Sequence, residues 1–331
     1  MVRISAIGVV LALAAALAAA SLTSHDASAR SQSGSISLVA YSTPRDAYTQ
    51  LIPAFQHTSA GQGTSFQQSY GASGEQARAV INGLKADVVE FSLEPDMTLL
   101  VKAGLVAKSW KKEPFRGIVT RSVVVFVVRK GNPKHIRSWN DLIKPGIDVL
   151  VPNVQTSGGA KWDVIAAYGA QRKLGKSHAQ SVKYLDKLYG HVVSQDKSAR
   201  EALQTFLAGR GDVLLSYENE AIFAQKHDQP VDFVMPKSTI QIANPIAVVK
   251  TSSNKTTARA FVNFLRTKPA QVIFAQNGYR PVVKAAAKGF SFPYPPGIFS
   301  IQWLGGWAKV DKQFFDPNKG IVTKIQKRHG S

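Results

Sequence analysis

Four segments of the sequence combine small residues and hydroxyl groups where a helix is predicted to begin. These segments are Ser42-Thr43, Ser73-Gly74, Ser157-Gly158-Gly159 and Ser198-Ala199. The first turn of a helix carries backbone N–H groups without intrahelical acceptors and a partial positive charge. Because small side chains let an anion approach these N–H groups, each segment is a candidate oxyanion site. Serine is also a common N-cap residue, so one such segment alone does not identify a ligand.

The sequence lacks the residue patterns of several enzyme and metal-binding classes. It contains no cysteine, which excludes thiol catalysis, cysteine-ligated zinc, iron–sulfur clusters and a lipid-modified cysteine anchor. Neither Ser73 nor Ser157 lies in a G-x-S-x-G sequence, and the seven histidines are scattered without catalytic or metal-site spacing. We therefore expect no enzyme activity, no metal and no cofactor, and we keep a serine-dependent hydrolase only as an alternative.

The chain is strongly basic, with 41 Lys and Arg residues against 21 Asp and Glu residues among 331. The basic residues are dispersed along the chain, and no basic motif interleaved with aromatic residues accompanies them. Dispersed charge is typical of a solvated surface, so we expect no nucleic-acid partner. With 44% hydrophobic residues, the chain has enough apolar material for packed cores.

Residues 1–29 have the composition of a secretory signal peptide. Arg3 supplies a positive charge, residues 7–20 form an apolar run, and Ala27-Ser28-Ala29 is a small-x-small cleavage sequence. The apolar run is shorter than the roughly 20 residues that a membrane-spanning helix needs. We therefore expect cleavage after Ala29 and a mature protein in the periplasm.

Predicted strands and helices alternate through the rest of the chain. Strands are predicted at residues 35–41, 65–69, 87–92, 118–129, 148–151, 192–193, 212–216 and 246–250. Helices are predicted at residues 44–55, 75–84, 95–103, 139–143, 158–170, 178–189, 199–208, 218–226 and 256–265. This order is typical of an α/β protein with mainly parallel sheets.

Two long apolar runs, at residues 118–129 and 240–250, predict two crossings between halves of the protein. The mature length fits two domains. Two crossings imply a discontinuous first lobe, at residues 30–117 and 246–331, and a second lobe at residues 118–245.

A series of motifs in chain order resembles the sulfate- and thiosulfate-binding proteins of bacterial ABC importers. The motifs lie at residues 41–45, 69–77, 83–89, 127–134, 138–142, 156–162, 211–220, 279–281 and 305–307. Together they cover essentially all of the mature chain, and several independent motifs at compatible spacing make the resemblance specific.

The resemblance implies a type II periplasmic-binding-protein fold, in which two lobes close over a dehydrated dianion held by neutral donors alone. It implies sulfate as ligand, a membrane ABC permease as partner, a role in sulfate transport and sulfur metabolism, and a monomer. The implied ligand residues are the hydroxyls of Ser73 and Ser157, the backbone N–H groups of Ser42, Gly158, Gly159 and Ala199, and the side chain of Tyr217.

Four charged residues lie close to these positions in the sequence. Arg45 and Arg200 lie just inside two of the helices, where they could influence the local field or pair with Asp46 and Asp196. Glu218 and Glu220 are expected to face the permease or solvent.

Two residues depart from the family pattern. Ser42 stands where sulfate-binding members often have aspartate, and Tyr217 stands where they have a tryptophan whose indole N–H binds the ligand. A phenol donates a hydrogen bond in a different direction from an indole. The choice among sulfate, thiosulfate, molybdate and tungstate therefore stays open. Phosphate is disfavoured, because its remaining proton needs an acceptor that a site made of donors lacks.

Overall fold

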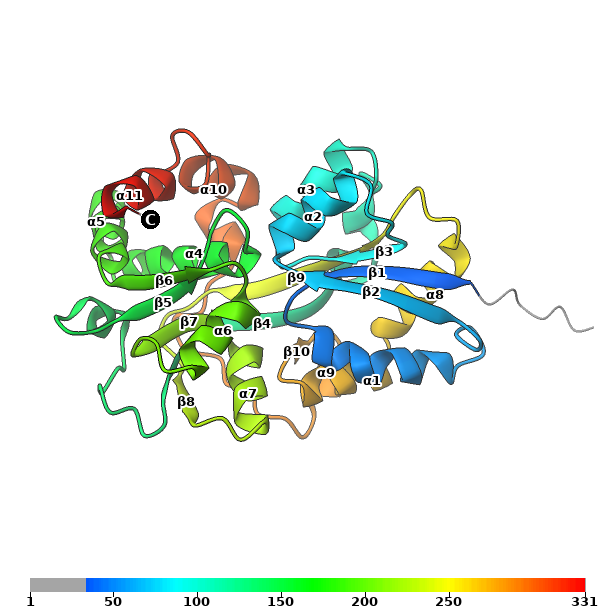
Figure 1. Ribbon diagram of the computed structural model, residues 1–331, viewed down its shortest axis with the longest axis horizontal. Coiled ribbons are helices and arrows are strands. Elements are labelled where there is room, and N and C mark those ends of the chain that lie inside the picture. Colours follow the sequence, from blue (N-terminus) through cyan, green and yellow to red (C-terminus); the bar gives the residue numbers. More distant parts are fainter. Residues whose placement is uncertain (1–33, 331) are drawn as a thin grey trace, which may run out of the picture. The chain divides into compact units, whose positions relative to one another are not determined.

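A continuous path of hydrogen-bonded strands runs through residues 34–330, the part of the chain that the computed structural model describes (Figure 1). The predicted signal peptide lies outside the described residues. The strand order is β2-β1-β3-β9-β4-β7-β5-β6, and β8 and β10 also pair with β4. The strands are β1 (Ser35–Tyr41), β2 (Ser65–Gly71), β3 (Val88–Glu90), β4 (Ile118–Arg129), β5 (Val149–Pro152), β6 (Val192–Asp196), β7 (Val213–Tyr217), β8 (Val231–Val234), β9 (Gln241–Val248) and β10 (Arg280–Pro281).

Helices connect most of these strands. The α-helices are α1 (Arg45–Gln56), α2 (Ser73–Ile81), α3 (Glu94–Lys102), α4 (Gly158–Lys173), α5 (His178–Tyr189), α6 (Ala199–Leu207), α7 (Glu218–Lys226), α8 (Lys255–Leu265), α9 (Lys268–Gln276), α10 (Trp307–Phe314) and α11 (Ile321–His329). Short 3₁₀ helices are η1 (Trp110–Lys112), η2 (Pro114–Gly117), η3 (Trp139–Ile143), η4 (Lys284–Ala287) and η5 (Ile301–Leu304). The predicted α/β class is confirmed.

The sheet is mixed, with two parallel groups joined by antiparallel strands. β1 is parallel to β2 and β3, and β5 is parallel to β6 and β7. β4 and β9 are antiparallel to each other, and each is also antiparallel to its neighbour in one parallel group. The two long strands predicted to cross between halves of the protein therefore join the two groups (Figure 1).

Helices cover both faces of the sheet, in the first parallel group and at the joining strand β4. In β1, Leu38 packs with α1, α8 and α9, while its neighbour Val39 packs with α2 and α3 on the opposite face. In β4, Phe126 packs with α4 and α5, while Val125 packs with α6 and α7. Successive side chains of a strand point to opposite faces, so burial on both faces requires the nearly continuous apolar run seen in β4.

The C-terminal helices pack against α4 and α5. Phe314 of α10 and Ile325 of α11 share one hydrophobic cluster with Trp162 and Leu185. The indole rings of Trp162 and Trp307 meet edge to face at 4.6 Å between centroids. The lobe boundaries stay a prediction, and this packing places α10 and α11 beside helices of the predicted second lobe.

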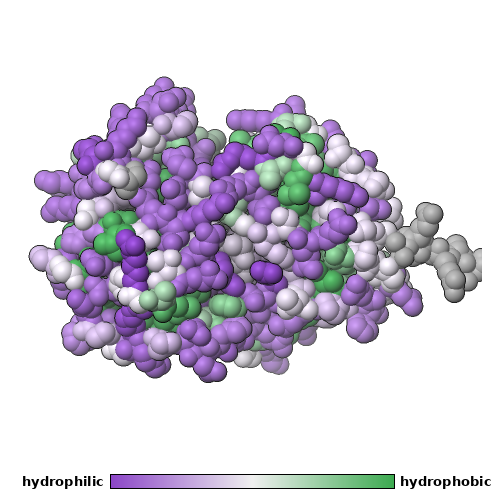
Figure 2. Space-filling model, in the orientation of Figure 1, coloured by the Kyte–Doolittle hydropathy of each residue, from purple (hydrophilic) through white to green (hydrophobic). Residues whose placement is uncertain are grey.

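The surface face drawn in Figure 2 is mostly hydrophilic, and its hydrophobic side chains form separate small patches. Within residues 34–330, no helix is both long and apolar enough to cross a membrane.

Candidate functional site

The N-terminus of α4 lies against two other segments of the fold. A Cβ atom built on Gly158 would lie 2.0 Å from Leu93 Cδ2 and 2.6 Å from Ser92 Cβ, in the segment after β3. A Cβ atom on Gly159 would lie 2.9 Å from Cε2 of Tyr217, at the end of β7. Glycine at both positions therefore permits the close approach of these segments to the first N–H groups of the helix.

Ser157 is the N-cap residue of α4. Its backbone is extended, it is 4% exposed, and its Oγ accepts a hydrogen bond from the Ala160 N–H at 3.4 Å. This cap leaves the N–H groups of Gly158 and Gly159, which have no acceptor within the helix, at the buried end of the macrodipole. The helix start predicted from the sequence is thus the one observed.

Ser73 begins α2 and is also buried. Its hydroxyl donates a hydrogen bond to Asp96 Oδ2 at 2.6 Å and accepts one from the Ser92 N–H at 2.9 Å. The next residue, Gly74, donates its N–H to the carbonyl of Thr156 at 2.9 Å. The α2 start is therefore tied both to the segment after β3 and to the segment that precedes α4.

Tyr217 lies at the junction of β7 and α7 and is 2% exposed. Its Oη lies 2.6 Å from Ser92 Oγ, and its ring centroid is 6.2 Å from that of Tyr41. Burial raises the pKa of Tyr217 well above its ordinary value, so the phenol keeps its proton and can donate. The hydroxyl of Tyr41 is buried and, among the described residues, has no hydrogen-bond partner.

Ser92 is the residue that links these elements, and the sequence did not single it out. Besides its bonds to Ser73 and Tyr217, its carbonyl accepts from Trp162 Nε1 at 2.9 Å and from Asn244 Nδ2 at 3.0 Å. Its only sequence signal was its place at the end of the predicted strand 87–92, just before a predicted helix.

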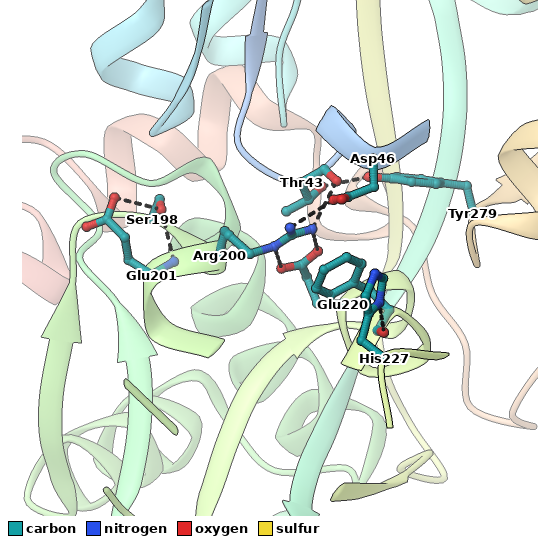
Figure 3. A network of polar contacts seen from close by, with 9 residues as sticks. Thr43, Asp46, Ser198, Arg200, Glu201, Glu220, His227 and Tyr279 are labelled. Atoms are coloured by element: carbon teal, nitrogen blue, oxygen red, sulfur yellow. Dashed lines mark hydrogen bonds and ion pairs between the residues drawn. The ribbon is translucent and has the colours of Figure 1, made fainter. Parts of the chain in front are cut away.

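Arg200, the second residue of α6, connects three helices (Figure 3). Its Nε and Nη2 bind the two carboxylate oxygens of Glu220 in α7 at 2.8 and 2.9 Å. Its Nη1 binds Asp46 Oδ2 in α1 at 2.8 Å, which is one of the pairings that the sequence left open. Asp196, the other partner considered, instead accepts hydrogen bonds from Ser194 and Thr205.

The expectation that Glu218 and Glu220 face the permease or solvent is wrong. The Glu220 side chain is 1% exposed and bound by Arg200. The Glu218 carboxylate is 2% exposed and forms a bidentate pair with Arg280 at 2.7 and 2.9 Å. Each carboxylate has a guanidinium partner from a distant segment, which compensates the cost of burying its charge.

The remaining predicted residues lie at the ends of β1 and β6. Ser42 is half-buried after β1, and Ala199 is buried at the start of α6, where Ser198 caps the helix. Arg200 connects these two regions through Asp46. Arg45 is exposed, and its guanidinium carbon lies 6.0 Å from the Tyr70 ring centroid.

The structure thus packs Gly159 against Tyr217 and Gly158 against Ser92, and Ser92 also binds Ser73 and Tyr217. Arg200, next to Ala199, binds Asp46 and the carbonyl of Thr43, which follows Ser42 in the chain, and Arg45 lies near Tyr70. Ligand contacts by the predicted residues stay a prediction.

Two buried carboxyl groups lie near these elements. Burial raises the pKa of Glu90 to about 8, although the Tyr48 hydroxyl, which donates to its Oε2, lowers it. Burial likewise raises the pKa of Asp163 in α4 well above its ordinary value. Because a protonated carboxyl carries no charge, Glu90 adds little repulsion toward an anion at neutral pH. Within residues 34–330, no cluster of three or more His, Cys, Asp or Glu side chains could hold a metal ion.

The sequence matches a family model described as bacterial extracellular solute-binding protein over residues 36–280. The sulfate-binding protein of Synechococcus elongatus is 42% identical to this chain over 302 residues, which cover 88% of this chain and 86% of the relative. The thiosulfate-binding protein of Pseudomonas aeruginosa is 34% identical over 291 residues, covering 84% of this chain and 88% of the relative.

A solved structure, titled the sulfate-binding protein SubI from Mycobacterium tuberculosis H37Rv, has a similar fold. It superposes with a TM-score of 0.83 and is 46% identical, covering 86% of this chain and 100% of that chain.

Proposed function

Because the chain belongs to the bacterial extracellular solute-binding proteins, we propose that it binds sulfate and delivers it to an ABC permease. The observation that carries this proposal is the packing at the N-terminus of α4. Gly158 and Gly159, whose N–H groups have no acceptor within the helix, pack against Ser92 and Tyr217 at a buried point where no Cβ fits. A helix N-terminus with several convergent donors is a favourable site for a divalent anion.

The proposed ligand set is the one that the family resemblance implies. The hydroxyls are those of Ser73 and Ser157, the backbone donors are those of Ser42, Gly158, Gly159 and Ala199, and Tyr217 adds its phenol. In this arrangement Ser73 turns its proton from Asp96 toward the ligand. Arg200 does not touch the anion but fixes α6 and α7 relative to α1, so that the donors of Ala199 and Tyr217 keep their positions.

A binding site that is made of hydrogen-bond donors and has no free carboxylate favours sulfate over phosphate. Monoprotonated phosphate needs an acceptor for its proton, and an unpaired buried donor or acceptor costs about 1–3 kcal/mol. The Glu220 carboxylate is bound by Arg200 through both of its oxygens, so it offers no free acceptor.

Thiosulfate is the second candidate, and Tyr217 is the observation that favours it. Its phenol replaces the indole that the sulfate-binding family pattern carries, and it is bound to Ser92. A relative named as thiosulfate-binding is 34% identical to this chain.

The proposed setting is the periplasm. We expect export by the signal peptide, cleavage after Ala29, and a monomer that is not an enzyme and that presents its closed form to the permease. The proposed lobes comprise residues 30–117 with 246–331 and residues 118–245, with β4 and β9 as the strands between them. Binding energy gained only in the closed form would shift the open and closed populations.

Isothermal titration of the mature chain, stripped of bound anions, tests the proposal. We expect a sulfate dissociation constant in the micromolar range or below, equivalent to about −8 kcal/mol or stronger, and no phosphate binding. Tighter binding of thiosulfate or molybdate than of sulfate would move the assignment to that anion. If none of the tetrahedral oxyanions bound, the proposed function would be rejected.

A further inference from the structure

A cavity of about 330 Å³ lies between the segment at residues 106–113, β9 with the residues after it, and α8. None of the proposed sulfate-binding residues lines this cavity. Its size is at the lower end of the range of small-molecule sites, about 300–1,000 Å³, and exceeds what a single inorganic ion fills. The cavity is therefore separate from the sulfate site and has room for a small organic molecule.

Arg266, which follows α8, lines this cavity, and its guanidinium forms no hydrogen bond with the described residues. Its side chain is 4% exposed, and its Nε, Nη1 and Nη2 have no hydrogen-bond partner among the described residues. Among the described residues, it forms a long ion pair with Glu113, whose Oε2 lies 3.7 Å from Nη1, beyond hydrogen-bond distance, and whose side chain is 59% exposed. A buried cation without a hydrogen-bonded partner is costly, so this guanidinium needs an anion.

The other charged residues around the cavity are mostly cationic. Lys250, Lys255 and Arg259 line it together with Arg266, and within residues 34–330 Glu113 is the one acidic residue in the lining. This balance attracts an anion, and the exposed Glu113 carboxylate is the group that competes with it.

Part of the wall is apolar. Trp110 and Val262 are 6% and 5% exposed, and Val106 and Ile246 complete this side of the lining. An inorganic anion would leave this surface without a partner, whereas an apolar group would cover it.

We propose that the cavity binds a small organic carboxylate, with its two oxygens on the Arg266 guanidinium and its apolar part against Trp110 and Val262. The planar fork of an arginine matches the two oxygens of a carboxylate and binds them in bidentate fashion. This site does not depend on the proposed sulfate function, because it shares no residue with the sulfate site.

The test uses 4-fluorobenzoate as a probe and follows its fluorine NMR signal on titration with the mature chain. Saturating sulfate is present throughout, so that the sulfate site is filled. The matched variants are Arg266→Met and Arg137→Met, since Arg137 is an exposed arginine outside the cavity. We expect the wild type and Arg137→Met to bind alike, and Arg266→Met to bind at least about tenfold more weakly. Equal binding by both variants, or no binding of the probe by the wild type in the presence of sulfate, would overturn the proposal.

A second variant keeps the test independent of any folding defect in Arg266→Met. Glu113→Gln removes the competing carboxylate from an exposed position, so we expect it to bind 4-fluorobenzoate more tightly than the wild type. Acetate should bind more weakly than benzoate because it leaves the apolar wall uncovered, and benzylamine should not bind. Unchanged affinity in Glu113→Gln, or binding of benzylamine as tightly as benzoate, would contradict the proposed carboxylate site.

Discussion

The phenol oxygen of Tyr217 lies 2.6 Å from the hydroxyl oxygen of Ser92, and this contact joins the end of β7 to the segment after β3. Both residues also contact the first turn of α4, at Gly159 and Gly158 respectively. The hydrogen bond therefore spans the point at which the proposed anion site is assembled, and several predictions depend on it.

Tyr217→Phe removes the phenol hydroxyl and leaves Ser92 Oγ without this partner. We expect sulfate affinity to fall by about tenfold, or about 1.4 kcal/mol, because one neutral donor is lost. The free energy of unfolding should fall by about 1 kcal/mol. Titration calorimetry and urea denaturation measure the two effects. Tyr294→Phe, at an exposed tyrosine, is the control and should change neither. Unchanged sulfate affinity in Tyr217→Phe would place the phenol outside the ligand site.

Ser73→Ala removes the hydroxyl that binds both Asp96 and the Ser92 N–H. Two buried polar groups then lose a partner, so we expect a stability loss of about 2 kcal/mol and weaker sulfate binding. The Ser73 hydrogen bond lowers the pKa of Asp96, which burial raises, so the variant should raise that pKa further. NMR titration of the Asp96 carboxyl carbon measures this shift. A lower pKa in the variant would contradict the assigned hydrogen bond.

Arg200→Met leaves the buried Glu220 carboxylate unpaired. Breaking such a pair costs about 3–5 kcal/mol, so we expect a loss of this size in the free energy of unfolding. The double variant Arg200→Met, Glu220→Gln should recover part of that loss because it removes the uncompensated charge. Chemical denaturation of the two single variants and the double variant completes the cycle. Simple additivity of the two single effects would show that the pair is not coupled.

Glu90 makes the stability of the fold depend on pH. Its pKa is raised from 4.5 to about 8 by burial, so the folded state binds more protons than the unfolded state between these values. The contribution of the Glu90 carboxyl to the free energy of unfolding is therefore complete below about pH 4.5. It falls as pH rises toward 8, by at most about 1.4 kcal/mol per pH unit. Glu90→Gln cannot ionise and should remove this slope. Urea denaturation at pH 6 and pH 8 compares the variant with the wild type, and equal pH dependence in both would be evidence against a raised pKa.

The sequence predicted the elements whose apolar pattern is strong. Residues 118–129 form β4 with the predicted bounds, and α4 begins at Gly158 as its serine and glycines indicated. The direction of strand pairing was not predictable, because the apolar run of β4 is the same for a parallel and an antiparallel neighbour. Helices α9, α10 and α11 were missed, although the buried Trp307, Val310 and Phe314 of α10 have helical spacing.

The hydrogen-bond partners at the site could be predicted only in part. Small residues at helix starts identified Ser157, Gly158 and Gly159, because local sequence determines capping. The role of Ser92 was not predictable, since its partner Tyr217 lies 125 positions away in the chain. The burial of Glu220 was not predictable for the same reason, since its partner Arg200 lies in a different helix.

Titration of sulfate into the wild type, Gly158→Ala and Gly190→Ala tests the central claim most directly. A Cβ on Gly158 would lie 2.0 Å from Leu93 Cδ2, whereas one on Gly190 would lie 3.2 Å or more from its neighbours. Circular dichroism checks that both variants are folded. We predict that Gly190→Ala binds sulfate like the wild type, and that Gly158→Ala binds at least about thirtyfold more weakly, a loss of about 2 kcal/mol. Sulfate binding by folded Gly158→Ala at wild-type affinity would contradict a sulfate site at the N-terminus of α4.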